Sequence, residues 1–341
     1  MSGRTLAGVR VLDLTRLLPG AYATLLLADL GADVVKIEDP RGGDAMRTLG
    51  GGVYFDALNR GKRSVTLDLR APDAAAVLDA LIARADAVVE SFRPSTARRL
   101  GVDAATLRGR HPRLVCASIS GFGPSGPYAE RAAHDINYQA LAGLLKPPAP
   151  PGPLVGDIGA AMQTAIAILA ALLQRERTGE GSAVDVPIHD AAMAWSIFPT
   201  TGDLASACYT LYETADGQWL ALGALEPKFW RGFCERIGRP DLVPLQHAAG
   251  DEGARVLDEV RAIVRSRSRE EWLARFADAD VCLSAVLTRD EAEHDPHVLA
   301  RGRSAADDRR APALGADTDA LLDDAGVAAA ARGRLRAAGV I

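Results

Sequence analysis

The chain has 341 residues, of which 48% are hydrophobic and 24% charged, and its formal net charge at pH 7 is −5. This length suits two domains, or one large and one small domain, of a globular protein. The small negative net charge does not indicate a nucleic-acid or membrane partner. The four cysteines show no CxxC spacing, and no signal-peptide pattern opens the chain, so we expect free thiols and a cytoplasmic protein.

The first part of the chain alternates predicted strands with predicted helices. A turn at Pro19–Gly20 separates the first strand from the first helix, and Gly31 is typical of a helix end. This order predicts β-α-β units, and so a large, doubly wound (Rossmann-like) parallel sheet. Neither a GxGxxG fingerprint nor a phosphate-binding GxxxxGK[ST] loop is present. The expected strands are 9–14, 33–38, 64–69, 87–90 and 114–119, and the expected helices are 21–30 and 72–85.

A glycine-rich loop then leads to two residues that can carry acid–base chemistry. His134, followed by Asp135, stands at the head of the apolar run 136–145, and Asp157 stands directly before the apolar run 158–173. Helix starts present unpaired N–H groups and a positive dipole end, which can hold or stabilise an anion. The run 158–173 is rich in alanine and interrupted by polar residues, so it favours a buried core helix over a membrane span.

The second part of the chain predicts a smaller α/β domain. A strand at 183–187 is followed by a linker, and a hairpin with an Ala-Asp-Gly turn then pairs 209–213 with 218–222. We expect helices at 228–237, 254–266 and 269–277, a strand at 281–286, and a final helix that ends near residue 338.

Each candidate also has an ordinary structural interpretation. An aspartate before an apolar run is most often a helix cap, and a lone histidine is most often a core or capping residue. Glu226, before Pro227, can be an ordinary helix-start acid, and arginines such as Arg93 are usually solvated. The other histidines lack metal-ligand spacing, and the chain has no GxSxG elbow, so a serine hydrolase is not supported.

Several stretches, in order, resemble the family III CoA transferases (CaiB/BaiF type). They are LAGVRVLDLTRLLPGAYATLLLADLGADVVKIEDP, NRGKRSVTLDLR, FRPSTARRLG and SISGFGPSGPYAERAAHD. The similarity covers residues 6–190 almost continuously and resumes at ADGQWLALGALEPKFW. Within the family, HDINY and ALEPKFW resemble the α-methylacyl-CoA racemase branch.

The resemblance implies a specific organisation. It implies a large CoA-binding domain over 1–190, a linker over 191–208, a small domain over 209–296, and a segment over 297–341 that returns to the large domain. It also implies an interlocked homodimer, with each active site between the large domain of one subunit and the small domain of the other.

The resemblance also assigns roles to individual residues. His134 and Asp157 match the two catalytic bases of the racemase branch, and Glu226 matches the carboxylate that partners the histidine. The residues that match CoA-contacting positions are Leu67, Asp68, Leu69, Arg70, Arg93, Ala133, Asp135, Ile136, Asn137 and Tyr138.

The reaction implied is racemisation at the α-carbon of a 2-methylacyl-CoA-like thioester. One base removes the α-proton, an enolate forms, and a second base returns a proton to the opposite face. A histidine suits one role, whereas an aspartate needs burial to raise its pKa for the other. The start of a helix at Ile158 is expected to offer N–H groups to the enolate, although its dipole opposes a raised pKa at Asp157. No metal or redox cofactor is expected, and CoA enters as part of the substrate.

Two alternatives remain open. In the transferase branch, the aspartate that Asp157 matches is a nucleophile that forms anhydride intermediates, and His134 and Glu226 then have no evident role. A catalytically lapsed CoA-binding protein is the other alternative, and the retention of all three residues argues against it.

The chain also departs from the racemase pattern. Asp39-Pro40 stands where that branch often has Arg-Pro, and Ala133 replaces a usual glycine. The stretch between Leu145 and Leu154 is short, and so is the stretch between Asp190 and Tyr209, which lacks the usual glycine-rich segment. Because of these departures, the sequence does not identify the acyl group of the substrate.

Overall fold

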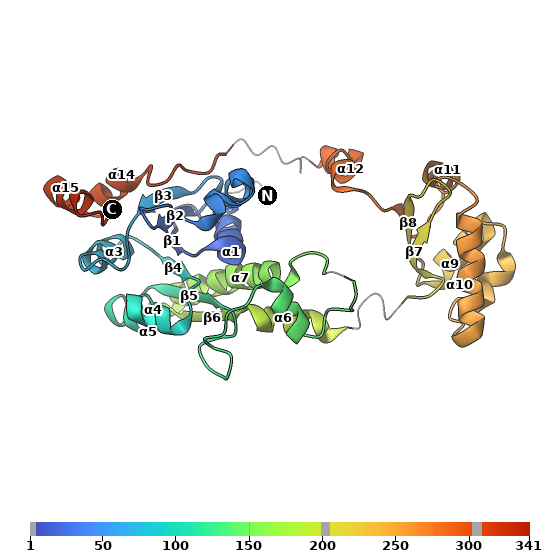
Figure 1. Cartoon of the computed structure of the whole chain (residues 1–341), viewed down its shortest axis with the longest axis horizontal. Coiled ribbons are helices and arrows are strands. Elements are labelled where there is room, and N and C mark those ends of the chain that lie inside the picture. The colour runs from blue at the N-terminus through green and yellow to red at the C-terminus, as the bar shows by residue number, and fades with distance from the viewer. Residues whose placement is uncertain (1–4, 150, 199–204, 302–308) are drawn as a thin grey trace. The chain divides into compact units, whose positions relative to one another are not determined.

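The computed structural model describes residues 5–149, 151–198, 205–301 and 309–341. The chain forms two compact units, which are described separately (Figure 1). Unit 1 comprises residues 1–197 together with 308–341, and unit 2 comprises residues 198–307. Residues 191–197 of the expected linker therefore belong to unit 1.

Unit 1 is built on a six-stranded sheet in the order β3-β2-β1-β4-β5-β6. All neighbouring strands are parallel, as the alternation of strands and helices predicts. The central strands are buried on both faces, which explains why they read as continuous apolar runs. The strands are β1 (Arg10–Leu14), β2 (Asp33–Glu38), β3 (Arg63–Thr66), β4 (Ala87–Glu90), β5 (Val115–Ser120) and β6 (Ala183–Pro187).

The chain order of the strands reverses between β1 and β4. From β1 the chain proceeds to β2 and β3 on one side, and from β4 it proceeds to β5 and β6 on the other. Leu12 of β1 accordingly pairs with Val35 of β2 and with Val88 of β4. In an open parallel sheet, such a switch point opens a crevice at the carboxyl ends of the strands, where ligands bind.

Helices cover both faces of the sheet and bury two separate apolar clusters. The first face carries α1 (Leu17–Asp29), α6 (Asp135–Leu141), α7 (Val155–Thr178) and α8 (Ile188–Ala194). The second carries α3 (Ala74–Ile82), α4 (Pro94–Leu100), α5 (Ala104–Arg110), α14 (Thr318–Asp324) and α15 (Ala329–Ala337). A short helix, α2 (Val53–Asn59), leads into β3.

The C-terminal segment returns to unit 1 beside β3, as Figure 1 shows. The Ser64 amide donates to Asp317 Oδ2 at 2.9 Å, and the Thr66 amide donates to Thr318 Oγ1 at 3.0 Å. Val340 and Ile341 are buried in the second apolar cluster. The segment therefore covers the edge strand, which would otherwise present unpaired backbone groups.

Unit 2 has its own sheet and its own core. The antiparallel sheet has the order β7-β8-β9, and the predicted hairpin forms its first two strands. Aromatic side chains fill the core, with Trp230, Phe233 and Phe276 in successive ring contacts. The elements are β7 (Tyr209–Glu213), β8 (Trp219–Gly223), α9 (Pro227–Arg236), α10 (Gly250–Val264), α11 (Arg269–Arg275), β9 (Leu283–Ala285), α12 (Arg289–Glu293) and α13 (Pro296–Ala300).

Helix α7 corrects one expectation and confirms another. It begins at Val155 rather than at Ile158, so Asp157 is its third residue instead of a cap preceding the helix. The glycine at position 156 is buried in the first turn, and the pattern of apolar residues did not reveal these three additional helical residues. The helix is long and apolar enough to span a membrane, but half of its most apolar window is buried inside the fold, which identifies it as a core helix.

Candidate active site

The candidate residues of unit 1 gather at the carboxyl ends of its parallel strands. Two cavities open there, on either side of the switch point between β1 and β4. We name them the Arg70 cavity, of about 220 Å³, and the His134 cavity, of about 340 Å³. Arg16, which follows β1, and Phe92, which follows β4, line both cavities.

The Arg70 cavity contains the first group of predicted CoA-contacting residues. Its lining includes Leu67, Asp68, Leu69 and Arg70, which follow directly after β3. Leu67 is buried in the second apolar cluster, and this anchors the start of the segment while Arg70 reaches solvent.

Four charged side chains form a closed set beside this cavity. Arg41 pairs with Asp39 and with Asp68, each at 2.9 Å. Arg70 pairs with the same two carboxylates, at 2.8 Å and 3.0 Å. Asp39 stands where the racemase branch often has an arginine, and here it binds both Arg41 and Arg70. Arg41 supplies a cation two residues after that position.

The His134 cavity brings together the two predicted bases of unit 1. His134 and Asp157 both line it, and so do Arg93, Ala133 and Tyr138. The histidine is the N-cap residue of α6, and its backbone amide donates to Asn137 Oδ1 at 3.0 Å. This places a titratable ring on the exposed side of a helix start, at the mouth of a cavity that also contains a carboxylate.

Asp157 lies in an environment that disfavours its charged form. Burial, and then the neighbouring carboxylate of Asp135, raise the pKa of Asp157 to about 7. The dipole at the start of α7 acts in the opposite direction. A carboxylate with this pKa is a far stronger base than an ordinary aspartate at neutral pH.

Asp135 is a buried support for the start of α7. Its side chain is 3% exposed, and Oδ1 accepts the backbone N–H of Asp157 at 2.9 Å. The Gln139 amide donates to the other oxygen. A Cβ atom at Gly156 would lie 3.1 Å from Asp135 Oδ1, so glycine at this position allows the carboxylate to approach the helix closely.

These contacts correct the expectation that the helix start offers N–H groups to an enolate at Ile158. The Ile158 amide donates to the carbonyl of Leu154 at 3.0 Å, because the helix begins earlier than expected. The Asp157 amide donates to Asp135. Both amides are therefore already engaged.

The remaining predicted residues lie outside the two cavities. Ile136 and Asn137 are exposed on α6 and line neither cavity, and Asp135 is buried beneath them. Glu226 belongs to unit 2, where it is the exposed N-cap residue of α9. Its partnership with His134 remains a prediction.

Sequence patterns assigned no role to Arg16 and Phe92, the two residues that line both cavities. Both residues follow strands that flank the switch point of the sheet, and the strand order that defines this switch point comes from the structure. Arg99, in the quoted stretch FRPSTARRLG, also lines the Arg70 cavity. Within the described residues, no group of three or more histidines, cysteines, aspartates or glutamates is arranged to hold a metal ion.

The chain is similar to characterised enzymes of two kinds. It is 33% identical over 323 residues to alpha-methylacyl-CoA racemase from Homo sapiens, which covers 87% of this chain and 81% of that protein. It is 32% identical over 330 residues to succinyl-CoA--D-citramalate CoA-transferase from Chloroflexus aurantiacus, which covers 87% of this chain and 82% of that protein. Racemases and transferases therefore resemble it to nearly the same degree.

Solved structures and a family model agree with this relationship. The crystal structure of Rv3272 from M. tuberculosis has a TM-score of 0.81 at 30% identity, over 92% of this chain and 98% of that one. A CAIB/BAIF family protein from Brucella suis has a TM-score of 0.79 at 28% identity, over 94% of this chain and 99% of that one. The model of CoA-transferase family III matches residues 6–316. The chain therefore belongs to CoA-transferase family III.

Proposed function

We propose that the protein is an acyl-CoA racemase or epimerase that acts at the α-carbon of a 2-methylacyl-CoA-like thioester. The observation that carries the proposal is the His134 cavity, in which a histidine and a carboxylate with a pKa of about 7 line one space. Two bases are what a 1,1-proton transfer needs, one for each face of the α-carbon. The reaction needs no group beyond the CoA of the substrate.

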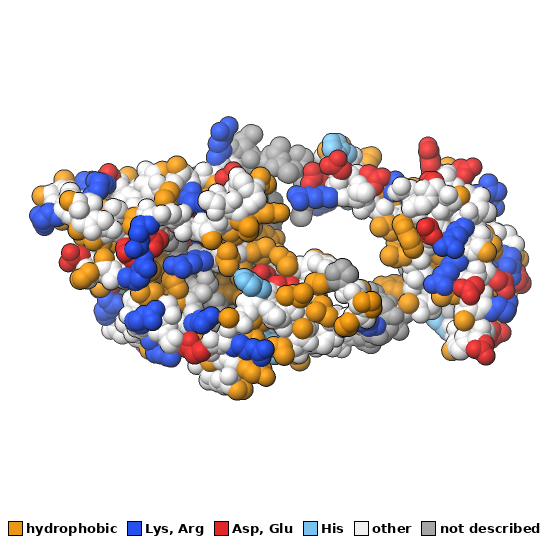
Figure 2. All heavy atoms as spheres, viewed as in Figure 1, with side chains coloured by type: hydrophobic (Ala, Val, Ile, Leu, Met, Phe, Trp, Pro, Cys, Tyr) orange, Lys and Arg blue, Asp and Glu red, His pale blue; other side chains and the backbone are white. Residues whose placement is uncertain are grey.

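The apolar surroundings of the cavity fit the acyl part of such a substrate. Ile136 in the first turn of α6, Leu141 at the end of α6 and Leu154 directly before α7 are each more than two-fifths exposed. Figure 2 shows hydrophobic side chains over this part of unit 1. The Arg70 cavity is on the other side of the switch point, and Arg16, Arg70 and Arg99 line it, so it fits the phosphate-bearing part of CoA.

CoA transfer between carboxylates is the second candidate function. The similarity to succinyl-CoA--D-citramalate CoA-transferase favours it, and so does the presence of Asp157 in the cavity. In that reaction the carboxylate of Asp157 attacks the thioester carbonyl, CoA leaves as the thiolate, and a mixed anhydride remains on the enzyme. His134 has no necessary role in these reaction steps, and this difference distinguishes CoA transfer from racemisation.

The test uses Asp157→Asn and His134→Gln, with each enantiomer of a 2-methylacyl-CoA in heavy water. Both variants should lose racemisation by at least about 100-fold, because one of the two bases is missing. Each should retain α-proton exchange for one enantiomer only, and the two variants should retain opposite enantiomers, because the remaining base faces one side. Glu180→Gln, on an exposed turn outside both cavities, is the control. Full racemisation by either variant would contradict the proposal, and loss of CoA transfer in Asp157→Asn alone would favour the transferase.

A further inference from the structure

The enolate of the proposed reaction needs a hydrogen-bond donor that the start of α7 does not provide. When a base removes the α-proton, negative charge develops on the carbonyl oxygen of the thioester, and donors that face this oxygen lower the barrier. The Asp157 amide is engaged with Asp135. The Ile158 amide is engaged with the carbonyl of Leu154. We therefore searched the lining of the His134 cavity for a donor that the fold leaves unused.

Ser120 is a buried hydroxyl group at the end of β5. It is 4% exposed and lines the His134 cavity together with His134 and Asp157. Its Oγ accepts the backbone N–H of Gly123 at 3.0 Å. Its hydroxyl proton has no acceptor among the residues that the structure describes. A serine hydroxyl can accept and donate at the same time, so Ser120 retains one donor that the protein itself does not use.

The surrounding backbone holds this hydroxyl in place. Ser120 pairs with Pro187 of β6, at the edge of the parallel sheet. The loop that follows is fixed as well, because the His189 amide donates to the Gly121 carbonyl at 3.0 Å. Gly123 has a φ of 82°, and a Cβ atom there would lie 3.2 Å from Pro187 Cγ, so glycine allows the loop to approach the sheet closely. A donor that is already in place requires no reorganisation during the reaction.

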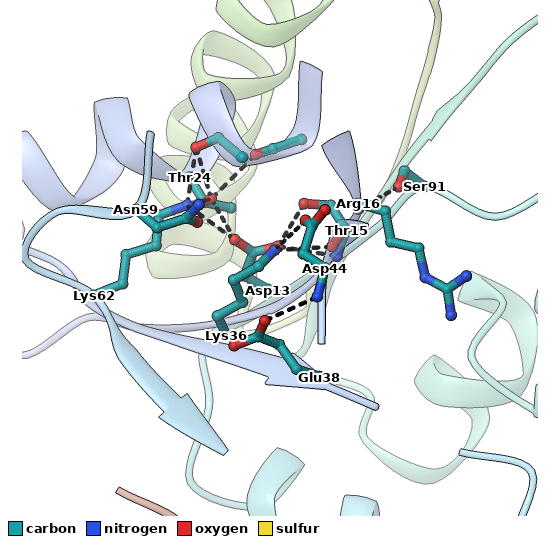
Figure 3. Close-up of polar contacts among 12 residues, drawn as sticks. Asp13, Thr15, Arg16, Thr24, Lys36, Glu38, Asp44, Asn59, Lys62 and Ser91 are labelled. Carbon is teal, nitrogen blue, oxygen red and sulfur yellow. Dashed lines mark hydrogen bonds and ion pairs between the residues drawn. The ribbon is translucent and has the colours of Figure 1, made fainter. Parts of the chain in front are cut away.

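Two other hydroxyl groups line the same cavity, and neither is an equal donor. The Tyr138 hydroxyl already donates to the carbonyl of Ala133 at 3.3 Å. Ser91 Oγ accepts the Arg16 amide at 3.0 Å, as Figure 3 shows, but Ser91 is only partly buried. Water therefore competes for the Ser91 hydroxyl to a greater extent than for the Ser120 hydroxyl.

The cationic side chains of the cavity are also in contact with water. Arg16, Arg93 and Arg131 line it, and all three are exposed. A hydrogen bond to a developing charge is worth more where water is excluded than at a solvated guanidinium. Burial thus distinguishes Ser120 from the other side-chain donors of the cavity.

We propose that Ser120 is a further catalytic residue, whose hydroxyl donates a hydrogen bond to the thioester oxygen as the enolate forms. This inference rests on the proposed racemisation. One base takes the α-proton, the electron pair of the C–H bond forms the C=C bond of the enolate, and the electron pair of the C=O π bond moves to the oxygen. Ser120 keeps its own proton throughout. The electron pairs return when the second base delivers a proton to the α-carbon.

The experiment measures deuterium uptake from heavy water at the α-carbon of each enantiomer of a 2-methylacyl-CoA. Both enantiomers pass through the same enolate, so Ser120→Ala should lower kcat for both exchange reactions by a similar factor, of about 100-fold, with little change in KM. Ser120→Cys keeps a side chain of similar shape, but a thiol is a weak donor. Its rates should therefore fall nearly as far as those of Ser120→Ala.

Ser182→Ala is the matched control, because Ser182 directly precedes β6, at the amino end of the strand, and lines neither cavity. Its exchange rates should equal those of the unaltered protein. Far-UV spectra and unfolding midpoints establish which variants are folded, and Ser120→Cys serves as the test if Ser120→Ala is not.

Three results would overturn the inference and leave the proposed function intact. The first is a loss of less than about 10-fold in a folded Ser120→Ala or Ser120→Cys. The second is a loss for one enantiomer only, because a displaced base would explain it. The third is a raised KM with an unchanged kcat, because Ser120 would then contribute to binding alone. If the unaltered protein takes up no deuterium, the proposed function fails, and the inference fails with it.

Discussion

At the scale of single residues, the central feature is a pair of neighbouring carboxyl groups at the start of α7. Asp157 faces the His134 cavity, while Asp135 is buried behind it and accepts its backbone amide. The folded protein keeps Asp157 protonated to about pH 7, whereas its ordinary pKa is 3.8. Since the native state then binds a proton that the unfolded state has released, this group lowers stability as the pH rises from 3.8 to about 7.

This arrangement predicts the behaviour of Asp135→Asn. The new side chain can still accept the Asp157 amide, but it no longer repels the Asp157 carboxylate. The acidic limb of the pH–rate profile should therefore move to lower pH, and the loss of stability between pH 4 and 7 should become shallower. Rate profiles and urea unfolding at a series of pH values would measure both effects. An unchanged acidic limb would show that Asp135 has no influence on the catalytic base.

At the scale of elements, the ends of β1 and β2 are joined by buried charge. Asp13 accepts hydrogen bonds from Thr15, Thr24 and Lys62, and its pKa is held well below the usual range by Lys36 and Lys62, although burial opposes this. Burial lowers the pKa of Lys62 to about 8. The cluster fixes the path of the chain where β1 ends and α1 begins.

Asp13→Asn should destabilise unit 1 by about 3–5 kcal/mol, because it leaves two buried lysines without their shared carboxylate. The matched control is Asp33→Asn, whose carboxylate pairs with Arg10 and Arg63 but is 32% exposed, and about 0–1 kcal/mol is expected for it. Urea unfolding at pH 7 measures both values. Equal, small losses of stability in the two variants would contradict the prediction, because the ion pairs of Asp13 with Lys36 and Lys62 would then not stabilise unit 1 more than an exposed ion pair does.

Sequence patterns also predicted most of the elements, for a physical reason. The ranges 33–38, 87–90 and 183–187 agree with β2, β4 and β6 residue for residue. For β2 and β4 the reason is burial, because strands buried inside a parallel sheet leave short runs rich in apolar residues. The start of α7 was misplaced, since Val155 and Gly156 continue a loop-like sequence and the capping contact comes from Asp135, which is distant in the chain. A cap of this kind leaves no local signal.

At the scale of the whole molecule, the family and the doubly wound parallel sheet could be predicted from the sequence, but the cavity lining only in part. His134, Asp157 and the segment from Leu67 to Arg70 carry recognisable motifs. Arg16 became visible only when the strand order placed the ends of β1 and β4 side by side. The sequence also does not reveal that Lys62 is buried, because nothing local to this lysine shows that Asp13 lies against it.

Unit 1 is also completed from the far end of the chain. The segment after residue 308 pairs with β3 and contributes Leu321, Leu322, Val340 and Ile341 to the second apolar cluster. The wall of the Arg70 cavity depends on this return, because the Asp68 amide donates to the carbonyl of Val340 at 2.8 Å. The cavity is therefore assembled from both ends of the sequence.

The measurement that tests the account most directly is α-proton exchange by the unaltered protein. One enantiomer of a 2-methylacyl-CoA is incubated in heavy water, with and without an acceptor carboxylate, and the products are followed by mass spectrometry and chiral analysis. We predict deuterium at the α-carbon and loss of stereochemical purity, at the same rate in both mixtures. Transfer of CoA to the acceptor without deuterium uptake would contradict the two-base account and make Asp157 a nucleophile.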